Sequence, residues 1–218
     1  MAVDKESVLK AIKELREKGK KRNFSQNFDL ILNFKDLDLK KQEQQLDFFM
    51  AYPTKTGKQI KVCALIGGEM IDDAKVSCDG YVQLEEFDKY VQDKKLAKKL
   101  ADQYDFFIAQ ANLMTKIAAA FGRTFGPRGK MPNPKAGCVV APKTPLKPLV
   151  DKLKNTIRIS VKTSPILQLG VGKDNLKDED IAGNVVEIYK QILAHLPNGV
   201  SNIRNTFLKM TMSAPVKL

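Results

Sequence analysis

The chain has 218 residues, with 37 Lys and Arg against 25 Asp and Glu, so its formal net charge is +12. This length allows one large domain or two small ones. No apolar run approaches the roughly 20 residues that a membrane-spanning helix needs, and the amino-terminal residues lack the apolar stretch of a secretory signal. We therefore expect a protein that stays in the cytoplasm and has no membrane partner.

Nucleophilic and metal chemistry have few candidate residues. Cys63, Cys78 and Cys138 are far apart and form no Cys-x-x-Cys pair, which predicts neither a disulfide framework nor a thiolate zinc site. The only histidine, His195, stands at the end of an expected helix, where its imidazole would interact favourably with the helix dipole. We expect no catalytic residue, no metal and no cofactor.

The first third of the chain predicts one helix and three strands. Apolar spacing indicates a helix over residues 4–18, and residues 24–34 alternate as a strand with one buried face. Two more apolar runs, 46–52 and 59–66, are separated by a turn containing Pro53 and Gly57, which favours an antiparallel hairpin.

The pattern changes from residue 62 onward. Continuous apolar runs at 62–66 and 106–109 alternate with helical stretches near 69–76, 85–103 and 112–124, which is typical of a parallel sheet covered on both faces. Alternation returns after residue 152, with strands predicted at 156–162, 166–171 and 201–212 and a helix at 178–195.

These two styles predict a two-domain protein of mixed α/β and α+β class. We expect an α+β domain formed by both chain ends, residues 1–61 and 153–218, and a Rossmann-like three-layer α/β domain inserted over residues 62–152.

The positive charge is concentrated in two regions. Residues 106–150 contain seven Lys or Arg and no carboxylate, and residues 188–218 contain four and none. Such regions favour a nucleic-acid partner, although a basic surface without a ligand is the alternative. No helix-turn-helix or zinc-finger spacing is present, which favours RNA over DNA.

Residues 122–137 combine glycines, prolines and cations, as a phosphate-contacting loop would. A structural loop between domains is the alternative. A nucleotide-hydrolysing P-loop would need Gly where Thr124 stands and Ser or Thr where Met131 follows Lys130, so a nucleotide-binding α/β enzyme is only the second hypothesis. The candidate secondary RNA or interdomain contacts are Arg123, Arg128, Lys130 and Lys135.

The run Gly-Pro-Arg-Gly-Lys-Met-Pro-Asn-Pro-Lys-Ala-Gly over 126–137 resembles the signature of the ribosomal protein L-one family, and the order of elements agrees along the chain. The Asn-Phe-Ser-Gln segment at 23–26 is similar to the archaeal branch. The resemblance implies a structural, non-enzymatic component of the large ribosomal subunit, monomeric when free. It implies binding to ribosomal RNA at the mobile stalk near the tRNA exit site, help in releasing deacylated tRNA, and in some members repression through the protein's own mRNA.

The resemblance also implies an RNA-binding surface on the first strand and around the end of the last. Short polar side chains there could bond sugar and phosphate, and Phe24 and Met212 could make flat apolar contacts, unless they are core residues instead. Asp29 stands where Glu is common, and Ser213 where Gly is common. The expected RNA-binding residues are Arg22, Phe24, Asn27, Asp29, Arg204, Asn205, Lys209, Thr211, Met212 and Ser213.

Overall fold

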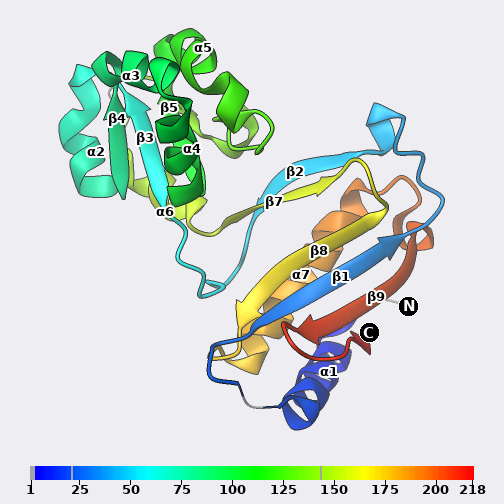
Figure 1. Ribbon diagram of the computed structural model, residues 1–218. Coiled ribbons are helices and arrows are strands. Elements are labelled where there is room, and N and C mark those ends of the chain that lie inside the picture. Colours follow the sequence, from blue (N-terminus) through cyan, green and yellow to red (C-terminus); the bar gives the residue numbers. More distant parts are fainter. Residues whose placement is uncertain (1–2, 21, 143) are drawn as a thin grey trace. The chain divides into compact units, whose positions relative to one another are not determined.

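The computed structural model describes residues 3–20, 22–142 and 144–218 (Figure 1). Contacts divide the chain into two compact units. Unit 1 combines the residues up to Lys58 with Ile157–Leu218, and unit 2 is Gln59–Thr156. These boundaries lie three and four residues from the positions at which the change of sequence pattern places them.

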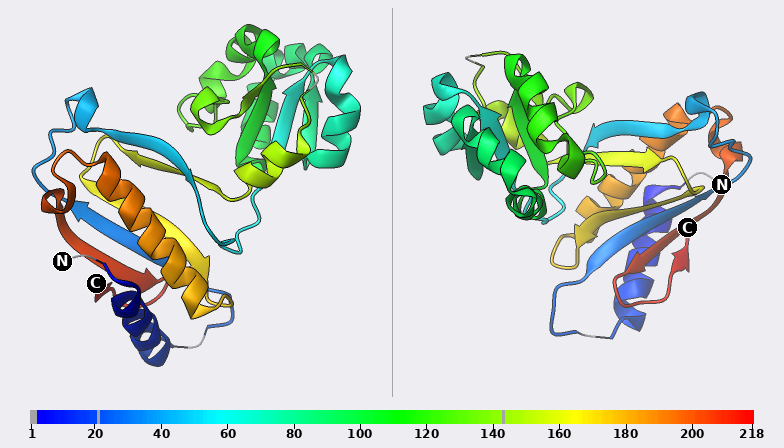
Figure 2. Two further views of the ribbon diagram at one scale, coloured as in Figure 1. Left: turned by 180° about the vertical axis from the view of Figure 1, so that it is seen from behind. Right: turned by 45° about the horizontal axis from the view of Figure 1, so that its top comes forward.

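Unit 1 is built on a four-stranded antiparallel sheet with strand order β10-β9-β1-β8. The strands are β1 (Asn27–Phe34), β8 (Ile166–Lys173), β9 (Ile203–Met210) and β10 (Val216–Lys217). Two helices, α1 (Lys5–Lys18) and α7 (Asp178–His195), lie on one face of this sheet. The strands are in front in Figure 1, and the helices are in front when the molecule is turned by 180° in Figure 2.

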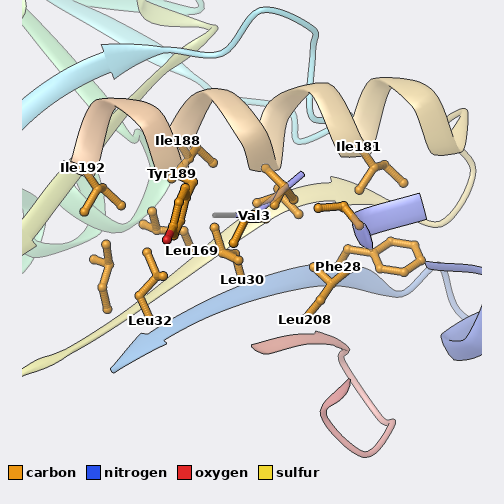
Figure 3. Close-up of a cluster of buried hydrophobic side chains, with 14 of the residues drawn as sticks. Val3, Phe28, Leu30, Leu32, Leu169, Ile181, Ile188, Tyr189, Ile192 and Leu208 are labelled. Carbon is orange, nitrogen blue, oxygen red and sulfur yellow. The ribbon is translucent and has the colours of Figure 1, made fainter. Parts of the chain in front are cut away.

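The core of unit 1 lies between the sheet and these helices. Phe28, Leu30 and Leu32 of β1 are buried and point toward the side on which α7 places Ile181 and Ile188 (Figure 3). Because strand side chains alternate between faces, Asp29, Ile31 and Asn33 fall on the face that the two helices leave uncovered. The buried and uncovered faces of β1 are those that the sequence predicts.

The predicted hairpin between the runs 46–52 and 59–66 is wrong. Strand β2 (Leu46–Ala51) pairs with β7 (Thr156–Val161), whereas β3 (Val62–Ile66) lies in the sheet of unit 2. Every residue of β3 is buried, so this strand is covered on both faces and cannot serve as the half-exposed partner of β2.

Unit 2 has a four-stranded parallel sheet with order β4-β3-β5-β6. Helices α3 (Phe87–Gln92), α4 (Lys94–Gln103) and α5 (Met114–Phe125) contact one another, and α2 (Ile71–Ser77) contacts α6 (Lys147–Leu153). The other strands are β4 (Gly80–Gln83), β5 (Phe106–Gln110) and β6 (Val139–Val140). The two helix groups and the sheet between them make three layers, and the predicted fold class is confirmed.

The predicted helix over 85–103 is two helices, because Asp93 interrupts it. The Asp93 carboxylate accepts a hydrogen bond of 2.8 Å from the backbone N–H of Lys95 and thereby caps α4. Sequence spacing alone does not show this break, since the apolar periodicity continues across it.

His195 is the last residue of α7, as predicted. Its Nδ1 lies 2.8 Å from the carbonyl oxygen of Gln191, and its ring stacks on Phe48 with centroids 3.8 Å apart. Cys63 and Cys138 are buried, and burial raises the pKa of the Cys138 thiol to about 11. Across the described residues, no helix has the length and apolar character to cross a membrane.

Candidate nucleic-acid interface

Two large apolar side chains are exposed at one end of the sheet of unit 1. Phe24, which precedes β1, is 51% exposed, and Met212, which follows β9, is 59% exposed. Because β1 and β9 are antiparallel neighbours, the start of one strand lies beside the end of the other. The interpretation of Phe24 and Met212 as core residues is therefore wrong.

Hydrogen bonds fix the backbone between these two side chains. The N–H of Asn27 donates to the hydroxyl of Thr211, and the N–H of Thr211 donates to the carbonyl of Asn27, each at 3.0 Å. The N–H of Met210 donates to the Ser213 hydroxyl at 2.8 Å. Thr211 and Ser213 thus first serve to hold the turn after β9, and a hydroxyl retains acceptor capacity beyond such a bond.

A shallow depression of about 250 Å³ lies on the uncovered face, next to this end of the sheet. Asp29 is paired in register with Gly170 of β8 on one side and with Lys209 of β9 on the other. Since Gly170 has no side chain, the depression opens above it, and Gln168 forms part of its wall. Burial raises the pKa of the Asp29 carboxyl, and the nearby charge of Lys209 opposes that rise.

The structure does not bring every expected residue to this end. Asn205 shares the uncovered face but pairs with Asn33, six residues along β1 from Asn27 and hence roughly 20 Å away. Arg204 lines a different depression, together with the core residue Val3. The residues gathered at the end of the sheet, termed here the strand-end surface, are Arg22, Phe24, Asn27, Asp29, Lys209, Thr211, Met212 and Ser213.

Residues 12–214 match the family model described as "Ribosomal protein L1p/L10e family". The chain belongs to this family. The large ribosomal subunit protein uL1 of Methanothermococcus thermolithotrophicus is 35% identical over 216 residues, which cover 99% of each chain. The uL1 proteins of Methanobrevibacter smithii and Pyrococcus abyssi are 37% and 36% identical, over 98% and 100% of this chain and 99% and 98% of theirs. The predicted resemblance and its archaeal type are confirmed.

Membership in the L1p/L10e family also confirms that the chain is not an enzyme, because this family consists of structural ribosomal proteins. In the loop of unit 2 that suggested nucleotide binding, two of the cations bind other residues of the same unit. The Lys130 ammonium donates to the carbonyls of Ala101 and Tyr104 at 2.6 and 2.8 Å, and Arg128 pairs with Asp102. Both cations therefore interact with the carboxyl end of α4, where free carbonyls attract positive charge.

The other two candidate cations are both exposed. Arg123 lies in the last turn of α5, and Lys135 lies in the L1p/L10e signature loop, residues 126–137. Asn133 shapes the loop around Lys135 by accepting a hydrogen bond of 2.9 Å from its backbone N–H. Gly137 follows with φ of +76°, a conformation that favours glycine. The segment 122–137 thus contains two cations that interact with other residues of unit 2, Arg128 and Lys130, and two that face solvent, Arg123 and Lys135.

Sequence reasoning missed the residues of β8 and the buried Gln26 in this L1p/L10e chain. Gly170 and Gly172 did give a signal, since glycines inside a strand often mark a bulge or the close approach of a ligand, and a register shift does occur opposite Phe28 and Asp29. Gln26 gave none, because a polar residue just before a strand is ordinarily exposed.

Proposed function

We propose that this chain is a protein of the large ribosomal subunit, acts in the cytoplasm as part of the ribosome, and binds large-subunit ribosomal RNA through the strand-end surface. The observation that carries the proposal is the exposure of Phe24 and Met212 on a backbone fixed by hydrogen bonds between segments far apart in sequence. The printed names of the relatives, large ribosomal subunit proteins, support the same conclusion.

The strand-end surface has the chemistry that folded RNA needs. Unstacked bases pack on aromatic and apolar side chains, for which Phe24 and Met212 are available. A ribose placed at the depression would present its 2′-hydroxyl to the Asp29 carboxylate, with the ammonium of Lys209 in reach of a phosphate. These contacts favour RNA with unpaired, splayed bases over a regular duplex.

Electrostatics adds attraction that does not depend on sequence. The carboxyl-terminal acid-free region, residues 188–218, lies in unit 1 and contributes Lys209 to the strand-end surface. On a plot of log affinity against log salt concentration, each phosphate contact makes the downward slope steeper by roughly 0.7–0.9. We therefore expect salt-sensitive binding whose specificity comes from the shape of the RNA.

We extend the proposal to the roles that the family resemblance implies: a place at the mobile stalk near the tRNA exit site, help in releasing deacylated tRNA, and repression through the protein's own mRNA. An mRNA segment that folds like the ribosomal site would meet the same surface, because recognition rests on shape. The exposed cations Arg123 and Lys135, in the acid-free region of unit 2, support a second contact to RNA such as tRNA.

The test is a titration of a fluorescently labelled, folded fragment of large-subunit ribosomal RNA with the full chain over a range of KCl concentrations. We expect log affinity to fall linearly with log KCl concentration. We also expect an unrelated RNA duplex to compete poorly with the ribosomal fragment. The protein's own mRNA leader and a deacylated tRNA serve as further competitors. Equal affinity for the unrelated duplex would contradict the specific role.

A further inference from the structure

The segments that carry Phe24 and Met212 are joined by the side chain of Gln26. This side chain is 5% exposed, and its Oε1 accepts a hydrogen bond of 3.1 Å from the backbone N–H of Met212. Gln26 lies 186 positions from Met212 in the sequence, so the bond connects the segment before β1 with the turn after β9. Among the described residues, the buried Oε1 of Gln26 is the only hydrogen-bond acceptor of the Met212 N–H.

Asp174, which follows β8, holds the other side of the same segment. Its carboxylate accepts from the Ser25 hydroxyl at 2.5 Å and from the N–H of Gln26 at 3.0 Å, and its own N–H donates to the carbonyl of Gln26 at 2.9 Å. The hydrogen bond from Ser25 and that from Gln26 keep the pKa of the Asp174 carboxyl below its usual range. The group is therefore charged at neutral pH.

Asp174 is itself anchored to α1. The Arg16 guanidinium donates to the carbonyl oxygen of Asp174 at 3.0 Å and to the carboxylate of Asp178 at 2.9 Å. Three segments, those around residues 25, 174 and 212, are thus tied to one helix. The hydrogen bonds form a continuous path from α1 through Asp174 and Gln26 to the exposed Met212.

We propose that Gln26 and Asp174 are positioning residues that hold the strand-end surface in its RNA-binding arrangement before RNA arrives. The inference rests on the proposed RNA-binding function. Neither residue needs to touch RNA. A loop that is ordered before binding loses no conformational entropy when RNA binds, so the full free energy of its contacts contributes to the affinity. If the turn after β9 is released, it loses conformational entropy on binding, and the affinity for RNA falls.

The chain offers a matched control for Gln26. Gln110 in unit 2 is 2% exposed, and its Oε1 likewise accepts a backbone N–H, that of Gly67, at 2.7 Å. Gln26→Met and Gln110→Met each remove one buried acceptor while keeping the side-chain length. Both variants lose an equivalent hydrogen bond, but only the first bond lies at the strand-end surface.

The experiment measures affinity for the folded ribosomal RNA fragment and the slope of log affinity against log salt. We expect Gln26→Met to bind about tenfold more weakly, on the order expected for ordering one short segment on binding, with an unchanged salt slope because no phosphate contact is lost. Gln110→Met should bind like the wild type. Wild-type affinity for Gln26→Met, or an equal loss in both variants, would overturn the inference.

A double-mutant cycle with Met212→Ala separates positioning from direct contact. If Gln26 acts through the placement of Met212, its substitution costs less than about threefold once the Met212 side chain is gone, because coupled residues are not additive. Full additivity would show that Gln26 does not act through the placement of Met212 and would contradict the inference.

Hydrogen exchange of the free protein tests the device without RNA. The amide of Met212 should exchange faster in Gln26→Met than in the wild type, while exchange in unit 2 stays the same. Unchanged exchange at Met212 would refute the inference whatever the RNA result. A wild type that fails to bind the ribosomal fragment would instead refute the proposed function.

Discussion

Replacing Phe24 by Ala removes the largest exposed apolar side chain of the strand-end surface. A Phe side chain buries roughly 150–250 Å² when fully covered, and Phe24 is 51% exposed, so on the order of 100 Å² remains for RNA to cover. At about 25 cal/mol per Å² this is about 2.5 kcal/mol, within the range of about 1–3 kcal/mol for stacking one base. We therefore expect RNA affinity to fall between about thirtyfold and a hundredfold.

About half of Phe24 is already covered by protein, so Phe24→Ala should also lower the free energy of unfolding, by about 1–2 kcal/mol. A suitable control is Phe34→Leu at the far end of β1, where Phe34 is 4% exposed. This substitution should reduce the free energy of unfolding by about 1 kcal/mol and leave the strand-end surface intact. Fluorescence titration with the ribosomal RNA fragment and urea unfolding provide the two readouts. If Phe24→Ala binds within twofold of the wild type while folded, our account of the strand-end surface is refuted.

Three further predictions concern other parts of the chain. In Gly170→Val the added Cβ lies about 3.6 Å from the Asp29 carboxylate, and the new side chain occupies the part of the depression next to that group. RNA affinity should therefore fall at least tenfold without loss of thermal stability. Undiminished affinity would show that RNA does not enter the depression. The hydrogen bond from Arg158 lowers the pKa of Asp47 from 3.8 to about 2, so the ionised carboxylate stabilises the fold fully above pH 3.8 and loses this effect as the pH falls through about 2. In urea titrations, the difference in unfolding free energy between wild type and Asp47→Asn should therefore shrink between these two pH values. A difference that stays constant would contradict this prediction. Lys130→Met removes the charged donor at the end of α4 and should destabilise unit 2 by about 1.5–3 kcal/mol. Its affinity for the ribosomal RNA fragment should stay unchanged. A large loss of affinity in the folded variant would instead show that the loop around Lys130 binds RNA.

The sequence predicts strands more reliably than it predicts their partners. The alternation of β1 identified its buried face, because burial on one side imposes a period of two. Strand β2 was assigned the wrong partner, since the nearest apolar run is favoured by proximity, whereas its partner β7 comes a hundred residues later, after the whole of unit 2. The alternation of side chains carries no information on which strand lies alongside.

The same limit explains what was missed in the candidate site. Phe24, Thr211 and Met212 could be found through their local motifs. The role of Gly170 in forming the depression beside Asp29 could not, because it depends on β8 lying next to β1. Lys130 shows a different ambiguity. A cation in a loop rich in glycine and proline looks the same whether it faces a phosphate or the carbonyls at the end of a helix, because both are negative.

Ultraviolet crosslinking of the protein in assembled ribosomes, followed by identification of the linked peptides and nucleotides, tests the central claim most directly. We predict that the linked peptides contain Phe24 and Met212, two exposed residues of one surface, and that the linked nucleotides belong to one folded site of large-subunit ribosomal RNA. Crosslinks confined to the loop around Lys135, or the absence of ribosomal RNA from the linked material, would contradict the account.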